Sequence, residues 1–280
     1  MNSSKMKNSI EENQIVFHTR SFYYEPMDKN VTILLQDLNG PCMLIAIINA
    51  LILQGKIELK ESQYDPESLN CILQAISPDA PDLSLLLTGF NINPCFSDCT
   101  AFKDYPAFLN SLGLKMVHSM VCDPRDVDYP YISELDYEAF QIELICLSEG
   151  KINSDSKIDA FNRWNEKLKK QTTRYGAKNI KSKMKENEFC IYFRGNHFSV
   201  ITKHDTNVYA LLTDEIFAMT NCIWESIPGE NGESVYYDTF FRPSEEVSSS
   251  GNASSSAEFI NSLIYQNENG SGNINPKATW

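Results

Sequence analysis

The chain begins with two short runs of mixed hydrophobic and polar residues, followed by one long run that is almost wholly apolar. Residues 15–24 ("IVFHTRSFYY") and 30–36 ("NVTILLQ") are rich in β-forming residues and are separated by the turn-prone "EPMDKN". They are therefore predicted to be strands. Residues 42–54 are apolar on nearly every helical face, which predicts a buried helix. Pro41 suits its first turn, and Gly55 suits its end.

The rest of the chain alternates between helical and strand patterns. Helices are predicted at 65–76, 83–90, within 99–114, at 137–147 and at 158–170. Strands are predicted at 115–121, 188–204, 207–217 and 221–227, with the turn-prone "DTN" between the second and third. This order predicts one α+β domain over residues 14–243. A flexible N-terminus (1–13) and a disordered Ser/Asn-rich tail (244–280) flank it.

Composition narrows the class of partner and the compartment. A net charge of −13 and a pI near 4.8 argue against nucleic acid or an anionic membrane as the main partner. The longest apolar stretch, 43–53, is too short to span a bilayer, and the polar N-terminus does not resemble a signal peptide. We therefore expect a cytoplasmic protein, with the nucleus as a second compartment, whose eight cysteines stay reduced. Cys95 and Cys99 have no second Cys or His pair nearby, so neither a metal site nor a cofactor is predicted.

Cys42 stands where the polar segment Gln36–Pro41 meets the predicted buried helix. A thiol attacks as thiolate, and its pKa falls at a helix N-terminus, where unpaired N–H groups and the helix dipole favour the anion. The helix would fix the position of the thiol, and a bend at Asn39-Gly40 would leave its front open. This placement makes Cys42 a candidate nucleophile.

A nucleophilic cysteine needs a base, and the chain has four histidines. His18 and His118 lie in predicted strands, where a structural histidine is expected, and His204, which precedes "DTN", is expected to sit at an exposed turn. His197 lies within "FRGNHFSVITKH", in a strand that would fix its ring, while Gly195 and Asn196 leave room beside it. His197 is therefore the candidate base.

Two further residues complete the candidate site. If the hairpin turns about Asp205-Thr206, Asp214 lies opposite His197 on the next strand, where a carboxylate would orient the imidazole. A slip of one residue would turn it away. The side-chain amide of Gln36 and the N–H of Cys42 are candidate oxyanion-hole donors, since an amide donates without repelling negative charge.

Each of these residues also has an ordinary structural interpretation. A cysteine at the start of an apolar helix is more often a small core residue, a strand histidine is more often structural, and polar residues are common before turns. Their joint order is more informative: Gln36, then Cys42, then a strand histidine about 150 residues later. That order is similar to the papain-like plan.

Longer motifs resemble one family. The segment "LLQDLNGPCMLIAIINALIL" resembles the catalytic segment of the MINDY deubiquitinases, whose motif runs Gln-Asn-x-Asn-Gly-Pro-Cys-Pro-Leu-x-Ala-Ile. "IYFRGNHFSVITKH", with the following "VYALLTDEIF" and "IWESI", resembles that family's histidine segment. "LLTGFNINPCF" and "LGLKMVHSMVCDP" resemble blocks between the two, so the likeness covers roughly residues 15–243.

The resemblance implies a papain-like cysteine protease fold and hydrolysis of the isopeptide bond of lysine-48-linked polyubiquitin, trimmed from the distal end. We expect the protein to be a monomer. The resemblance also implies that Cys42 is the nucleophile, His197 the general base and Gln36 the oxyanion-hole residue. Phe193 and Arg194, on the strand before the histidine, are implied contacts of the ubiquitin tail. The resemblance does not make Asp214 catalytic.

The chain also departs from the family pattern. Asp37 replaces the usual Asn, Met43 replaces Pro or Ala, and Phe17 stands where the family often has Tyr before a histidine. The changes at Asp37 and Met43 remove no reacting group, whereas Phe17 lacks the hydroxyl that would restrain the resting cysteine if it does so in relatives. Two alternatives stay open: an inactive ubiquitin-binding module with the same fold, and a cysteine acyl-transfer enzyme or protease with another substrate.

Overall fold

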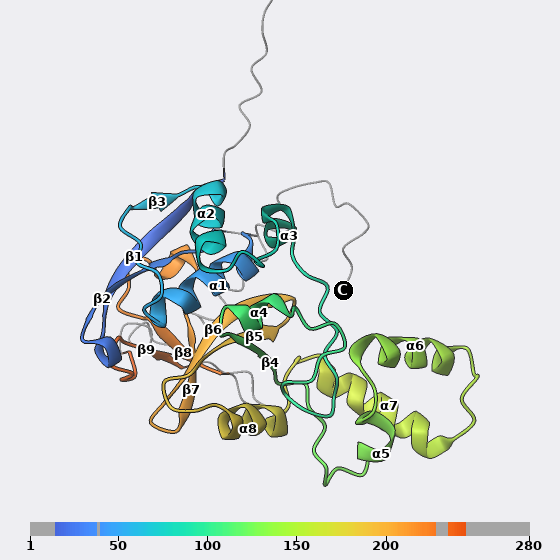
Figure 1. Ribbon diagram of the computed structural model, residues 1–280. Helices are drawn as coiled ribbons and strands as arrows, with labels where there is room; N and C mark the ends of the chain where they lie inside the picture. The colour runs from blue at the N-terminus through green and yellow to red at the C-terminus, as the bar shows by residue number, and fades with distance from the viewer. Residues whose placement is uncertain (1–14, 38–39, 228–234, 245–280) are drawn as a thin grey trace, which may run out of the picture.

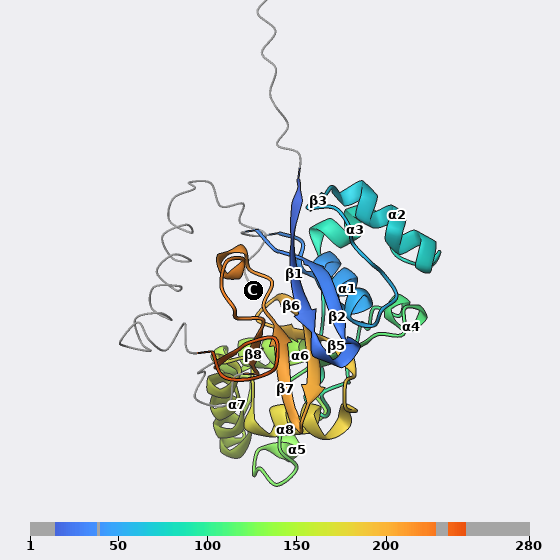
Figure 2. The ribbon, with the colours of Figure 1, turned by 90° about the vertical axis from the view of Figure 1, so that its left-hand side faces the viewer.

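The protein folds around helix α1 (Cys42–Leu53), which packs between a small sheet and a larger one. The computed structural model describes residues 15–37, 40–227 and 235–244. The small antiparallel sheet has the order β2-β1-β3 and consists of β1 (Phe17–Tyr24), β2 (Lys29–Leu34) and β3 (Gln63–Tyr64). Figure 2 looks onto this sheet, with α1 behind it. The predicted strands 15–24 and 30–36 and the predicted buried helix are confirmed.

The larger sheet carries the histidine segment. Its order is β4-β5-β6-β7-β8-β9, and β4 runs parallel to β5 while the other neighbours are antiparallel. Its strands are β4 (Lys115–His118), β5 (Phe189–Arg194), β6 (His197–His204), β7 (Asn207–Leu211), β8 (Trp224–Ser226) and β9 (Tyr236–Tyr237).

Two strand predictions are wrong in detail. The predicted strand 188–204 is a hairpin, β5 and β6, that turns at Gly195 and Asn196, whose φ values are 61° and 58°. Two consecutive residues at positive φ make the tight turn that suits the twist of a hairpin. The predicted strand 207–217 ends at Leu211, because the chain then bends into the short 3₁₀ helix η2 (Glu215–Phe217).

Helix α1 is buried on every side because protein covers it from both sheets. Met43–Leu53 are all buried, including Met43 at 1% exposure and Asn49 at 0%. Val31, Ile33 and Leu34 of β2 meet it from one side, and Phe198 and Val200 of β6 meet it from the other. Gly55, at φ 73°, ends the helical segment as expected.

The remaining helices cover the sheets and build a second lobe (Figure 1). The lobe of α5–α7 has an aromatic core of Phe96, Phe140, Phe161 and Trp164, with ring centroids 5.1–5.9 Å apart. The helices are α2 (Pro66–Ile76), α3 (Leu83–Thr88), α4 (Phe108–Ser111), α5 (Tyr129–Ile132), α6 (Tyr137–Ser148), α7 (Asp155–Leu168) and α8 (Arg174–Lys183), with the 3₁₀ helix η1 (Glu25–Met27) between β1 and β2. The sequence patterns did not predict α5 and α8.

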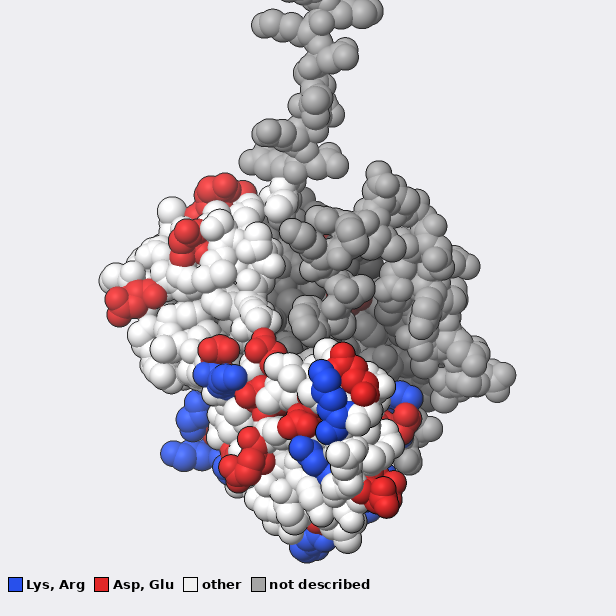
Figure 3. Space-filling view, turned by 90° about the vertical axis from the view of Figure 1, so that its right-hand side faces the viewer, with Lys and Arg blue, Asp and Glu red and all other residues white. Residues whose placement is uncertain are grey.

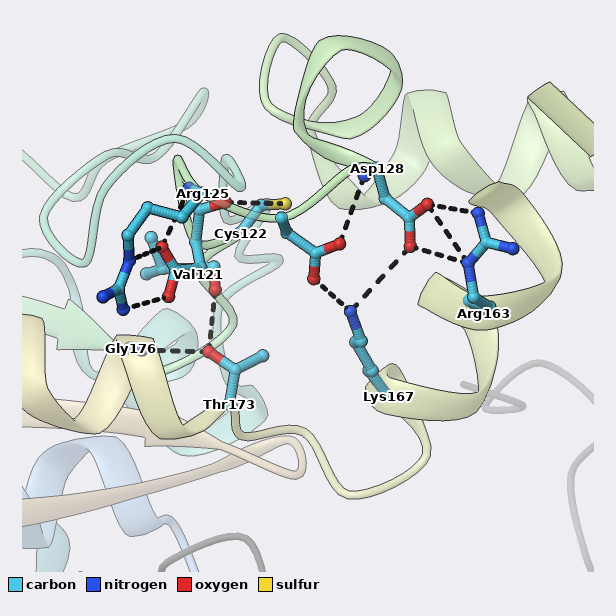
Figure 4. Close-up of polar contacts among 10 residues, drawn as sticks. Val121, Cys122, Arg125, Asp128, Arg163, Lys167, Thr173 and Gly176 are labelled. Carbon is cyan, nitrogen blue, oxygen red and sulfur yellow. Dashed lines mark hydrogen bonds and ion pairs between the residues drawn. The ribbon is translucent and has the colours of Figure 1, made fainter. Parts of the chain in front are cut away.

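Ion pairs fasten α7 to the loop that follows β4 (Figure 4). Asp128 is 1% exposed and accepts hydrogen bonds from Arg163 Nε to both carboxylate oxygens, at 3.2 and 3.1 Å. Lys167 Nζ lies 2.5 Å from Asp126 Oδ2 and 3.9 Å from Asp128 Oδ2. A buried carboxylate is tolerated only when it is paired in this way.

The surface carries both signs of charge. On the face shown in Figure 3, Lys and Arg are interleaved with Asp and Glu over the lobe nearest the viewer. The charged side chains visible on the lobe above it are acidic. In the part of the chain that the structure describes, no helix is long and apolar enough to cross a membrane.

Candidate functional site

Gln36 and Asp214 join the two sheets at one point. They form an isolated parallel β-bridge, in which the Gln36 N–H donates to Thr213 O at 2.6 Å and the Glu215 N–H donates to Gln36 O at 3.3 Å. The bridge uses only the backbone of Gln36. Its side-chain Nε2 donates to the carbonyl of Gly40 at 3.1 Å, and since an amide has two N–H groups, one donor is left for another acceptor.

Cys42 is the first residue of α1, and its side chain is half-buried against β6. Burial raises the pKa of the Cys42 thiol, and the backbone N–H groups of Phe198, Met43 and Cys42 itself act in the opposite direction. The expected lowering of the pKa at the helix N-terminus is therefore wrong, because withdrawal of the thiol from water outweighs the backbone donors. The thiol is protonated at neutral pH.

His197 begins strand β6 and stands at the surface, one residue before Phe198. The surrounding protein lowers the pKa of the imidazole by withdrawing water from it, and the negative charge of Asp214 acts in the opposite direction. The lowered pKa leaves a neutral ring at pH 7, which is the form that can accept a proton.

The candidate residues divide between two adjoining cavities. His197, Gln36, Asp214 and Arg194 line a cavity of about 630 Å³. Cys42 lines a neighbouring one of about 400 Å³, together with Gly40, the carbonyl partner of Gln36. The described residues form no hydrogen bond between the Cys42 thiol and the imidazole. Cys42 and His197 thus line different cavities, and the link between them is Phe198, which follows His197 in β6 and lines the cavity of Cys42.

The hairpin register agrees with the prediction up to the end of β7. Ile201 pairs with Ala210 and His204 with Asn207, the offset that places position 214 opposite 197. The ladder stops before His197, because β7 ends at Leu211 and Asp214 pairs with Gln36 instead. Asp214 also caps η2, since its Oδ1 accepts from the Ile216 N–H at 2.9 Å.

The two implied substrate contacts differ in access. Phe193 is 7% exposed and packs on Phe198, with ring centroids 5.2 Å apart, although it still lines a small cavity of about 160 Å³. Arg194 is half-exposed, pairs with His197 across the hairpin and lines the histidine cavity. Of the two, Arg194 is the more accessible to a ligand in the cavity beside His197.

The other histidines are structural or bonded elsewhere. His118 is fully buried between the Ala101 carbonyl, 3.1 Å from Nε2, and the Met120 N–H, 3.2 Å from Nδ1, and burial lowers its pKa to about 4. His18 lies on β1, as expected, with Nδ1 2.6 Å from Glu215 Oε1. The expectation that His204 is exposed is wrong, because its ring is half-buried and stacks on Phe241 with centroids 4.2 Å apart.

Sequence patterns missed the residues that border the Cys42 cavity. Leu86–Asn91 form one wall, at the end of α3, and Asn196 and Phe198 form the other. Residues 83–90 carried only a helical pattern, and the sole signal was the family-like block "LLTGFNINPCF". Asn39, on which the predicted bend rested, lies outside the described residues. Within those residues, no group of three His, Cys, Asp or Glu side chains is placed to hold a metal ion.

A cysteine at the N-terminus of a buried helix that packs on a strand beginning with a histidine, within a mixed but mainly antiparallel sheet, fits a papain-like cysteine protease fold. The family model described as MINDY deubiquitinase matches residues 15–241. The chain therefore belongs to the MINDY deubiquitinase family.

Named relatives agree with this membership. The chain is 29% identical over 243 residues to ubiquitin carboxyl-terminal hydrolase MINDY-1 of Pongo abelii, which covers 77% of this chain and 52% of the relative. It is 28% identical to the Homo sapiens MINDY-1 with the same coverage. It is 26% identical to MINDY-2 of Mus musculus, over 81% of this chain and 42% of the relative. The chain spans about half the length of the curated relatives it matches.

Proposed function

We propose that the chain is a cysteine-type deubiquitinase that hydrolyses the isopeptide bond of lysine-48-linked polyubiquitin. Cys42 is the nucleophile, His197 the general base and Gln36 the oxyanion-hole residue. The observation that carries the proposal is the meeting of α1 and β6: the Phe198 N–H acts on the Cys42 sulfur, one residue along β6 from His197. Family membership supports the reaction class and ubiquitin as the substrate.

In the first half of the reaction, His197 takes the thiol proton and the Cys42 sulfur bonds to the isopeptide carbonyl carbon. The resulting oxyanion accepts hydrogen bonds from the Gln36 amide and the Cys42 N–H. The C–N bond then breaks, and His197 returns its proton to the departing lysine amine.

In the second half, His197 takes a proton from water, and the hydroxide attacks the thioester carbonyl. The C–S bond breaks, the ubiquitin that was held as the thioester leaves with a free carboxylate, and the thiol regains the proton from His197. Arg194 lines the cavity beside His197 and contacts the substrate there, while Phe193 shapes the neighbouring cavity from beneath. The chain works as a monomer in this proposal.

The test is a panel of linkage-defined tetraubiquitins incubated with wild-type protein, Cys42→Ala and Cys71→Ala. Cys71 is an exposed cysteine on α2 and serves as the matched control. We expect cleavage of lysine-48-linked chains by wild type and Cys71→Ala, and none by Cys42→Ala. Turnover that survives in Cys42→Ala would overturn the proposal.

A ubiquitin-derived electrophilic probe separates the enzyme from an inactive binding module. The protonated thiol of Cys42 is the observation that favours the inactive reading. Covalent labelling of wild type and Cys71→Ala, but not Cys42→Ala, supports the enzyme. Binding of ubiquitin with no labelling of any variant supports the module.

A further inference from the structure

A groove leads away from Cys42 toward the second lobe. The cavity that Cys42 lines shares four residues with the smaller cavity next to it: Phe90, Asn91, Asn196 and Phe198. The two are therefore compartments of one groove, with the end of α3 on one side and the tip of the β5–β6 hairpin on the other. An extended peptide bound with its carbonyl at Cys42 would continue into the smaller compartment, which is mostly apolar.

Glu138 is the one charged side chain among the described residues that line this groove. It lies in the first turn of α6, and its side chain is half-exposed. Its Oε1 accepts a hydrogen bond from Asn91 Nδ2 at 3.3 Å. Asn91 also lines the cavity of Cys42, so Glu138 stands one residue away from the compartment that holds the thiol.

The carboxylate of Glu138 has acceptor capacity to spare. Two carboxylate oxygens offer about four lone-pair sites, and the long bond from Asn91 occupies one of them. Among the described residues, no Lys, Arg or His lies within ion-pair distance of Glu138, whereas Asp136, two residues earlier, pairs with Lys103 at 3.4 Å. A favourable interaction with the helix dipole suits an acidic residue in a first turn, but it does not direct the side chain into a groove.

We propose that Glu138 is a specificity-determining residue that pairs with a cationic side chain of the acyl donor, a few residues before the scissile carbonyl. This rests on the proposed function. The lining of the smaller compartment, apolar side chains beside one carboxylate, suits a tail with an apolar and a cationic residue before the scissile carbonyl. Ubiquitin's carboxyl-terminal tail, Leu-Arg-Gly-Gly, has this chemistry, and its arginine is the partner that Glu138 binds.

The test is a charge exchange with ubiquitin that carries a fluorogenic amide at its C-terminus. One substrate has the natural tail, and the other has the tail arginine replaced by glutamate. The variants are Glu138→Gln, Glu138→Lys and, as matched control, Glu134→Gln, which neutralises an exposed glutamate outside the groove. We expect Glu138→Gln to lower kcat/KM for the natural tail by roughly 10-fold, mainly through KM, because a charge-assisted contact is lost.

Glu138→Lys should cleave the glutamate tail better than wild type does, and Glu134→Gln should match wild type on both substrates. A change below 2-fold in Glu138→Gln, or no gain of Glu138→Lys on the glutamate tail, would overturn the role of Glu138. If wild type shows no turnover of either fluorogenic substrate, the tetraubiquitin panel decides the proposed function, and affinities decide the question of Glu138. In fluorescence anisotropy, Cys42→Ala should then bind the natural tail more tightly than the glutamate tail. The double variant Cys42→Ala/Glu138→Lys should bind the glutamate tail more tightly.

Discussion

Asn49, at the centre of the buried helix, pairs with the backbone of Leu34 as a neighbouring strand would. The Leu34 N–H donates to Asn49 Oδ1 at 2.8 Å, and Asn49 Nδ2 donates to the Leu34 carbonyl at 2.9 Å. Leu34 ends β2, the edge strand of the small sheet, and its outer side has no further strand to pair with in the sheet order. The Asn49 side chain of α1 thus satisfies the free backbone groups at the edge of the sheet, two residues before Gln36.

We expect Asn49→Leu to destabilise the fold by roughly 2–6 kcal/mol, since two buried backbone groups lose their partners at about 1–3 kcal/mol each. Urea unfolding of the two proteins measures the difference. Asn70→Leu is the matched control, because Asn70 lies half-buried on α2 and its Oδ1 has no partner among the described residues. Equal losses in the two variants would contradict the role of the Asn49 pair.

The Gln36 side chain can be altered without breaking the bridge to Asp214, because that bridge uses only its backbone. Gln36→Ala should therefore lower kcat on lysine-48-linked chains on the order of 10²-fold, the effect of removing one oxyanion donor, with little change in KM. Steady-state kinetics with unchanged thermal stability is the measurement.

Asp37→Asn is the control for Gln36→Ala. It alters the adjacent exposed side chain, restores the residue usual in the family, and should leave kcat within 2-fold of wild type. A Gln36→Ala protein with wild-type kcat would remove Gln36 from the site.

Gly176 fixes α8 against the end of β4. A Cβ built there would lie 2.0 Å from the Ser119 carbonyl oxygen, a backbone atom that a side-chain rotation cannot move. The position is tied from both sides, because Thr173 Oγ1 accepts from the Gly176 N–H at 2.9 Å and donates to Val121 O at 2.7 Å (Figure 4).

Gly176→Ala should cost about 3 kcal/mol or more, the upper range for a small-to-large change in a packed interior. Lys178→Ala on the exposed side of α8 should change stability by less than about 0.5 kcal/mol. Thermal unfolding compares the two variants. A Gly176→Ala protein as stable as wild type would show that α8 can move away from β4.

Sequence patterns predicted the elements whose burial is uniform. Residues 42–53 are apolar on nearly every helical face, which predicted a buried helix, and the structure encloses that helix between two sheets. The β5–β6 hairpin was missed although its signal was present: Gly-Asn between two β-rich runs is typical of a two-residue hairpin turn. Because the residues on both sides of that dipeptide have a strand pattern, the whole segment was predicted as one continuous strand and the turn was missed.

The chemistry of the site was less predictable than its residues. Motif order predicted that Gln36, Cys42 and His197 act together, but the direction of the shift in the Cys42 pKa depends on how much protein covers the thiol. That cover comes from residues distant in sequence, such as Phe198. The end of β7 at Leu211 likewise depends on Gln36, which competes for the backbone at Asp214.

The pH dependence of the reaction follows from the two shifted groups. His197 acts as base only when neutral, and its lowered pKa places the acid limb of kcat/KM below the ordinary value of about 6.5. The Cys42 thiol, with a raised pKa, should be alkylated by iodoacetamide along a curve whose midpoint lies above the ordinary range near 8.5. The profile of kcat/KM against pH tests the shift at His197, and the profile of alkylation rate between pH 5 and 10 tests the shift at Cys42.

Asp214→Asn separates the effect of the Asp214 charge on the His197 pKa from the structural role of Asp214 as the cap of η2. The asparagine oxygen can still cap η2, but the negative charge that raises the His197 pKa is gone. Removing it should move the acid limb of kcat/KM to still lower pH, while thermal stability stays near that of wild type. An acid limb that moves upward or stays in place would show that the Asp214 carboxylate does not act on the imidazole.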